Sequence, residues 1–150
     1  DQGEHARVQL DDVVALSRFR LEPEDHALIV DADAGKAEAQ CDLALLFLIQ
    51  NQPSEAAQWL TLAAKQNYPE GMHQLGRCHI VGNGVEANQA LGIEWISRAA
   101  ALGHSTARHM AQYLIDPNRP VMDGAALEVK LDAIEQRVVF AALRETAAPA

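Results

Sequence analysis

The central part of the chain nearly repeats itself. In the first half of each copy Leu43 aligns with Leu75. In the second half Trp59 aligns with Trp95, once a four-residue gap is set opposite residues 83–86. Each copy spans roughly 36 residues and reads as two helices, and such a unit buries its apolar face only by stacking on its neighbours. The chain therefore predicts an array of stacked helical hairpins, a fold that offers a binding surface more readily than an active site.

Helix-ending residues recur in step with the repeat. Gly35, Asn67 and Gly103 each follow an apolar run at helical spacing, and both residue types tolerate the left-handed conformation that ends helices. Pro53 and the segment 82–84 mark the turn inside each copy. We therefore expect helices at about 10–20, 23–34, 37–50, 53–66, 69–81, 88–102, 105–115 and 124–145.

Because these elements are all helices, we expect an all-α fold, a short right-handed α-solenoid of helix-turn-helix repeats with a C-terminal capping helix. At 150 residues the chain is long enough for one domain with a continuous core. The single domain 1–150 is expected to contain a degenerate N-terminal hairpin (10–34), a short repeat (37–70), a full repeat (71–106), the start of a third repeat (107–115) and the capping helix (123–146).

The longer copy carries small and aromatic residues at fixed positions. They are Gly71, Leu75-Gly76, Gly82-Asn83-Gly84-Val85, Trp95, Ala99-Ala100 and the turn Gly103-His104. With these residues the segment 71–107 resembles the Sel-1-like repeat, a relative of the tetratricopeptide repeat, and the resemblance extends over about residues 32–115.

The neighbouring units match this pattern less well. The copy at 39–70 keeps Trp59 but has Ala44 in place of the glycine, and it lacks the Gly-x-Gly turn. The third unit begins at Ala107 and departs from the pattern at Ala111-Gln112. The shorter copy is therefore the better place to look for a function particular to this chain.

The resemblance implies a non-catalytic protein–protein interaction module, an adaptor or regulatory subunit that holds a segment of another protein in its concave groove. The family is widespread in bacteria, which implies a bacterial adaptor. In this family the first helix of each unit lines the concave face. The residues expected to line the groove are Cys41, Leu45, Leu48, Ile49, His73, Arg77, Ile80, Val81, His109 and Tyr113.

The stretch 43–49 is apolar on every side, and a helix of this kind should be covered all round. Its cover is a partner segment held in the groove, the terminal helices of the same chain, or a second copy of the chain. Arg77 is the one fixed charge in the expected groove, and we expect it to pair with a carboxylate of the partner.

The last helix is apolar on two sides. Asp123 is a good N-cap, and Leu127, Leu131 and Ile134 lie at the spacing of a helix that closes the end of a stack. An apolar second side is either buried or meets a partner, so self-association through this helix is an alternative function. The residues that would form the contact are Val129, Phe140 and Leu143.

A metal-binding protein is the other alternative. It would use His73, Cys78, His79 and His109, but their spacing matches no known zinc site. We therefore expect no metal and no cofactor. No nucleophile, phosphate-binding or dinucleotide motif is present, so we expect that the protein is not an enzyme.

The formal net charge of −9, without a basic stripe, argues against a nucleic-acid partner. No apolar run is long enough to span a bilayer, so membrane insertion is not expected. The chain shows no signal-peptide pattern, and we expect a cytoplasmic protein, with an exported mature protein as the alternative.

Overall fold

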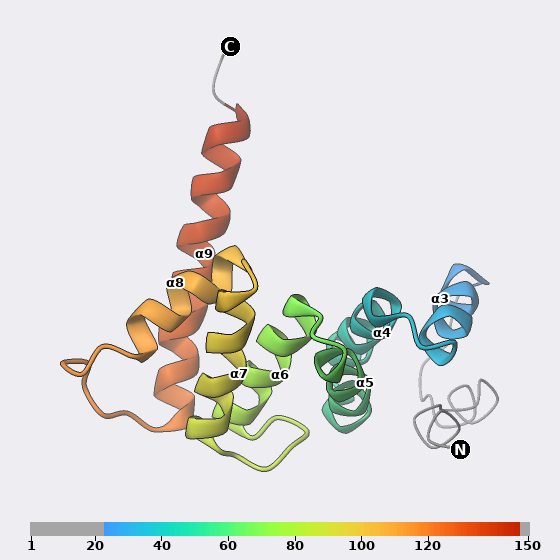
Figure 1. Cartoon of the computed structure of the whole chain (residues 1–150), viewed down its shortest axis with the longest axis horizontal. Helices are drawn as coiled ribbons and strands as arrows, with labels where there is room; N and C mark the ends of the chain where they lie inside the picture. The colour runs from blue at the N-terminus through green and yellow to red at the C-terminus, as the bar shows by residue number, and fades with distance from the viewer. Residues whose placement is uncertain (1–22, 148–150) are drawn as a thin grey trace.

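The computed structural model of the chain describes residues 23–147, and every regular element within that range is a helix (Figure 1). The prediction of an all-α solenoid is confirmed, and the predicted bounds agree with the observed ones to within one or two residues. The expected helix at 10–20 lies outside the described residues. The helices are α3 (Pro23–Asp33), α4 (Ala37–Ile49), α5 (Pro53–Lys65), α6 (Pro69–Val81), α7 (Gln89–Ala101), α8 (Ser105–Leu114) and α9 (Gly124–Ala147).

The helices from α3 to α8 pack in chain order. The hairpins α4–α5 and α6–α7 are the two sequence repeats, and α5 and α7 each also pack on the first helix of the next unit. In Figure 1 the labels follow one another along the long axis of the molecule. One continuous cluster of buried apolar side chains runs through the stack, from Ile29 of α3 to Ile134 of α9. The stacking required by the repeat is therefore what forms the core.

The expected helix-ending residues have the required backbone conformation. Asn67 has φ 60° and Gly103 has φ 95°, both in the left-handed region. Gly84 has φ 77°, and a β-carbon added there would lie 2.1 Å from the carbonyl oxygen of Pro53. The extra loop of the second repeat is thus packed against the first turn of α5, which explains why a glycine is needed at this position.

The third unit has a first helix but no regular second one. Gln112 of α8 occupies the position of Gly76 and is exposed, because no second helix packs against it. After α8 the chain instead leads into α9, which packs across both α6 and α8 (Figure 1). The third unit therefore departs from the repeat pattern at Ala111-Gln112 because the series of regular hairpins ends there, and a polar side chain is exposed at that end.

The long helix α9 is anchored at one end and free at the other. Asp123 is its N-cap as predicted, since its Oδ1 accepts a hydrogen bond from the amide of Ala126 at 2.8 Å. Leu127, Leu131 and Ile134 are buried. From residue 139 to residue 147 every side chain is exposed, and this half projects beyond the other helices (Figure 1).

Candidate functional site

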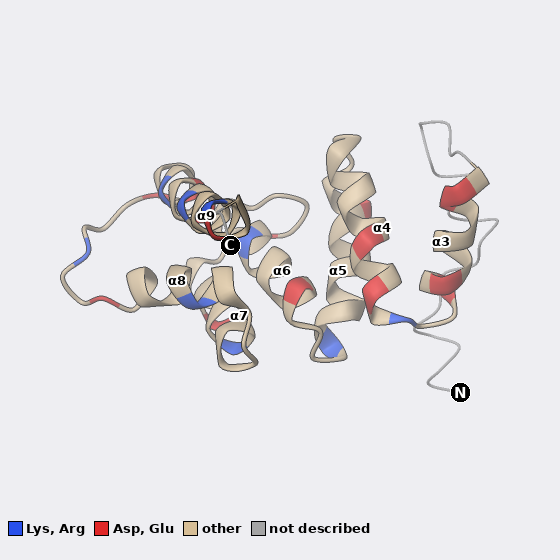
Figure 2. Ribbon diagram, turned by 90° about the horizontal axis from the view of Figure 1, so that it is seen from above, with Lys and Arg blue, Asp and Glu red and all other residues tan. Residues whose placement is uncertain are grey.

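The predicted groove residues lie on the first helices of successive units, α4, α6 and α8. Leu45, Arg77 and Tyr113 occupy equivalent positions on these three helices. Seen from above, α9 lies beside α6 and α8, and α4 stands apart from it (Figure 2). The structure therefore brings Arg77 and Tyr113 together next to α9 and leaves Leu45 away from that helix.

Arg77 is held by three carboxylates of α9. Its guanidinium donates to Glu135 Oε2 at 2.8 Å and also to Glu128 and Asp132, while its side chain is 10% exposed. Burial alone would lower the pKa of Arg77, but hydrogen bonds and charges of the carboxylates raise it. Burial raises the pKa of Glu128, against the attraction of Arg77. The carboxylates expected from a partner are thus supplied by the chain itself.

These three carboxylates were missed by sequence reasoning, although a signal for them exists. Glu128, Asp132 and Glu135 recur at intervals of four and three residues, so they form one acidic stripe along α9. Within the described residues Arg77 is the cation bound to that stripe. The stripe and the lone arginine of the predicted groove together point to a helix docked on α6.

His73 was predicted to face the groove, and it is instead buried. Its ring stacks on that of His104, with 4.6 Å between the centroids. Neither ring nitrogen of His73 has a hydrogen-bond partner among the described residues. Burial, together with the charges of His104 and Arg77, lowers the pKa of His73 to about 4 against the pull of Glu70. His73 is therefore a neutral core side chain at neutral pH.

His104 links the second repeat to the third unit. Its Nδ1 accepts a hydrogen bond from the amide of Ala107 at 3.0 Å and so caps α8, and its Nε2 bonds to Glu70. Burial alone would raise the pKa of Glu70, but the hydrogen bonds from His104 and Gln74 lower it. The histidine that the sequence identified as a turn residue is thus also a structural bridge between α6 and α8.

Two more of the predicted groove residues belong to the core. Cys41 and Ile80 are buried, so their predicted outward orientation is wrong. Burial raises the pKa of the Cys41 thiol to about 12 and that of Cys78 to about 11. Both thiols are therefore protonated at neutral pH, and neither is an activated nucleophile.

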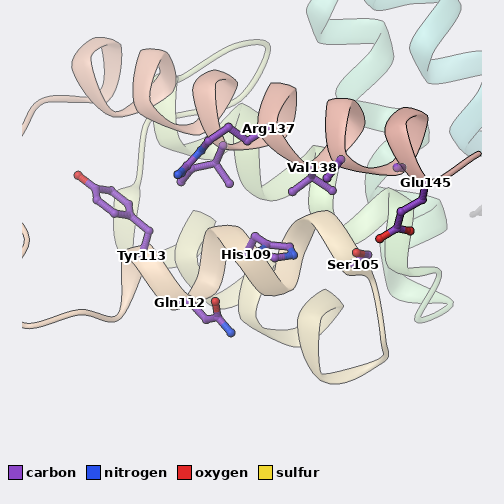
Figure 3. A pocket seen from close by; sticks show the side chains of 10 residues that line it. Ser105, His109, Gln112, Tyr113, Arg137, Val138 and Glu145 are labelled. Atoms are coloured by element: carbon purple, nitrogen blue, oxygen red, sulfur yellow. The ribbon is translucent and has the colours of Figure 1, made fainter. Parts of the chain in front are cut away.

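A groove of about 630 Å³ separates α8 from residues 134–145 of α9 (Figure 3). His109 and Tyr113 line it from α8, opposite Val138 of α9, and Arg137 and Glu145 lie along the α9 wall. Lys130 of α9 lies over the ring of Tyr113, 5.0 Å from its centroid. This groove contains the α8 part of the predicted site.

A second, smaller hollow of about 230 Å³ lies on the other side of α9. Leu48 lines it from α4, Arg77 and Val81 line it from α6, and Glu128 lines it from α9. The single predicted groove is thus divided by α9 into two parts. One part lies against α8, and the other opens toward α4.

The α4 side of the smaller hollow continues onto an exposed helix face. Glu38, Asp42, Leu45 and Ile49 follow one another at helical spacing, and Ile49 is 77% exposed. The equivalent residues of α6 are Glu70, Gln74, Arg77 and Val81. The two acidic residues of this α4 face were not among the predicted site residues. Their spacing with Leu45 and Ile49 is the signal that would have included them.

The metal alternative is not supported by the arrangement of its side chains. His73 stacks on His104, while Cys78 lines the smaller hollow and His109 lines the larger one. Between residues 23 and 147 no group of three or more histidine, cysteine or carboxylate side chains is placed to hold a metal ion. In the same part of the chain no helix is both long enough and apolar enough to cross a membrane.

Comparison with known families gives one match. The family model described as Sel1 repeat matches residues 37–68 and residues 69–104. The first match covers α4 and α5, and the second covers α6 and α7. No curated protein and no solved structure matches the chain.

Proposed function

Because the chain belongs to the Sel1 repeat family, whose repeats generally serve as protein–protein interaction modules, we propose that it binds a helical segment of another protein on the exposed face of α4. We define this α4 face by Glu38, Asp42, Leu45 and Ile49 together with Leu48 at its edge. In this proposal the protein is a non-catalytic adaptor.

One observation carries the proposal: the same face of the next repeat holds a helix. On α6 the equivalent face contains Arg77 and Val81, and α9 docks there through Arg77. On α4 the equivalent face carries Leu45 and Ile49 and is half-buried to exposed. Since repeated units present equivalent surfaces, a helix is the element that fits the α4 face.

The chemistry of the α4 face indicates what that helix carries. Leu45, Leu48 and Ile49 offer apolar contacts, so the partner helix needs an apolar stripe. Glu38 and Asp42 lie on the same face, and Glu128 forms the nearby wall of the smaller hollow. This negative rim selects a helix with lysine or arginine beside its apolar stripe, mainly by accelerating association and rejecting acidic segments.

Synthetic amphipathic helices test this proposal directly. One peptide carries leucines at i, i+3, i+4 and i+7 with flanking lysines, and its matched control carries glutamates in place of the lysines. Fluorescence anisotropy is expected to show at least roughly tenfold tighter binding of the lysine peptide at low salt, since opposite charges attract and like charges repel. Equal binding of both peptides would contradict the charge argument.

The location is tested with Leu45→Glu combined with Ile49→Glu. This double variant is expected to lose peptide binding and keep its helical content by circular dichroism, because both side chains point away from the core. Ile115→Glu is the matched control, since Ile115 is 67% exposed at the end of α8 and far from α4 in the chain. Loss of helical content in the double variant would show that these side chains are core and that the site is elsewhere.

A further inference from the structure

Helix α9 exposes apolar side chains along the side that faces away from the repeats. Val129, Phe140 and Leu143 are 70%, 61% and 56% exposed. The opposite side of the helix carries the buried Leu127 and Leu131. The projecting part, residues 139–147, is shorter than the roughly 12–15 residues below which an isolated helix is marginal in water, and tertiary packing provides most of the stability of a helix. Packing of the exposed apolar strip against another helix would therefore stabilise α9.

The spacing of the strip is that of a two-helix seam. Val129, Gln136 and Leu143 are seven residues apart, and so are Ala133, Phe140 and Ala147. The two series interlock at intervals of four and three, as the d and a positions of a heptad repeat do. Such a strip packs against a helix that has the same heptad periodicity. The α9 helix of a second copy of this chain has this periodicity along the whole strip.

Charges beside the strip select one orientation of the second copy. Lys130, Arg137 and Arg144 follow one flank, and Asp132 lies on the other flank. In a parallel pair, a residue on the second flank faces the residue five positions later on the first flank of the partner helix. Asp132 then faces Arg137 of the second copy, twice by symmetry. An antiparallel pair would set the three cations against the same three cations.

Asp132 is available for this second contact although it binds Arg77. Its side chain is 53% exposed, and Glu128 and Glu135 also bind the same guanidinium. The buried side of α9 faces α6 and α8, so the two sets of repeats lie on opposite sides of the seam. We propose that the chain forms a parallel homodimer through the α9 strip of Val129, Gln136, Phe140 and Leu143.

Sedimentation of the full chain at increasing concentration tests the dimer. We expect a reversible shift from the monomer mass to twice that mass, because the short seam is at the small end of specific interfaces. Phe140→Glu combined with Leu143→Glu should remain monomeric, and Ile115→Glu should dimerise like the unmodified chain. A monomer at every concentration, or an unchanged dimer in the double variant, would overturn the proposal.

Arg137→Glu tests the orientation without touching the apolar residues. In the parallel pair the introduced carboxylate lies opposite Asp132 of the second copy, twice by symmetry, and exposed charge pairs of this kind change the dissociation constant by roughly tenfold in total. We therefore expect the variant to dimerise more weakly than the unmodified chain at low salt. At high salt the difference should disappear, because the ions screen these exposed charges. In an antiparallel pair the same change would remove repulsion among the cations, so tighter association would overturn the parallel arrangement.

Disulfide trapping gives an independent readout of the seam. Gln136→Cys places a thiol at a d position, where the two copies of a parallel pair face each other across the seam. Mild oxidation should give a covalent dimer with Gln136→Cys and none with Val121→Cys, whose parent side chain is exposed outside α9. Cys41 and Cys78 are buried and do not compete. Equal trapping of the two variants would contradict the proposed seam.

Discussion

The two repeats share one fold but use equivalent positions differently. Arg77 of the second repeat is bound by three carboxylates of α9, whereas its counterpart in the first repeat, Leu45, lies in an exposed face. The second repeat therefore holds a helix of its own chain. We infer that the first repeat, with leucine at this position, is the one that holds a helix of another protein.

The interiors of the two repeats differ as well. The first has Cys41 where the second has His73, and both side chains are buried. The first has Ala44 and Ala56 where the second has Gly76 and Gly92. A solenoid thus keeps the positions of its helices while exchanging the residues at their contacts. Exchanging these residues between the repeats shows which differences matter.

The largest effect is expected from replacing Arg77 by leucine, the residue of the first repeat. Glu128, Asp132 and Glu135 would then face one another without their cation. Removing one partner from a buried ion pair destabilises a fold by about 3–5 kcal/mol, and because these three carboxylates are partly exposed the expected loss lies near the lower end of that range. Urea unfolding should show that loss, and amide hydrogen exchange should show faster exchange in α9, because the helix loses its anchor on α6.

The reciprocal exchange serves as the control for this prediction. Leu45→Arg changes a half-exposed side chain on which no helix between residues 23 and 147 docks a carboxylate stripe, so the free energy of unfolding should change by less than about 0.5 kcal/mol. Adding Glu128→Gln to Arg77→Leu should recover part of the lost stability, since one of the three uncompensated charges is removed. An Arg77→Leu variant as stable as the unmodified chain would mean that α9 is held by its apolar side alone.

A smaller, pH-dependent effect is expected from His73. Its pKa is lowered to about 4 in the folded chain, from an ordinary value near 6.5 in the unfolded chain. The unfolded state therefore binds a proton first as the pH falls, and the free energy of unfolding decreases between pH 6.5 and pH 4 by at most about 3 kcal/mol. The groups that influence this titration are His104, Glu70 and Arg77.

The variant His73→Cys, which introduces the residue of the first repeat, isolates this contribution. Thermal unfolding at pH 7 and at pH 5 should show a smaller difference for the variant than for the unmodified chain. The lowered pKa of Glu70 also makes the fold less stable in acid, but that loss falls mainly below pH 5, and the hydrogen bonds from His104 and Gln74 that lower this pKa most are kept in the variant. Equal differences in the two proteins would show that His73 is protonated as readily in the folded chain as in the unfolded one.

Local signals account for the part of the fold that could be predicted from the sequence. Gly35, Asn67 and Pro69 act on their own helix ends, so helix bounds follow from neighbouring residues alone. The path of α9 could not be predicted in this way, because it depends on contacts between Arg77 and residues more than fifty positions later. An acidic stripe pairs with any cation, and only the folded chain shows which one is near. The sequence therefore did not predict that α9 lies against α6 beside the expected groove residues, and the groove itself remains a prediction.

The smallest effect is expected at the crossing of α6 and α7, where the two repeats carry different residues. A β-carbon added at Gly92 would lie 2.6 Å from the carbonyl oxygen of Gly76 and 2.7 Å from a side-chain carbon of Ile80. The crossing of α6 and α7 is therefore set by contact of their backbones. In the first repeat Ala44 and Ala56 are both buried at the equivalent crossing, which accommodates two methyl groups.

The substitution Gly92→Ala has two opposed effects on the free energy of unfolding. Alanine stabilises an isolated helix by about 1 kcal/mol relative to glycine. Forcing a methyl group into the backbone contact costs about 1–3 kcal/mol, because α6 and α7 must move apart. We expect the contact to win by about 1 kcal/mol in urea unfolding, whereas the opposite exchange, Ala56→Gly, should be destabilising by helix propensity and lost packing together. A Gly92→Ala variant more stable than the unmodified chain would show that α7 shifts freely on α6. The two repeats would then differ in sequence at this crossing, but the glycines of the second repeat would not be required for its packing.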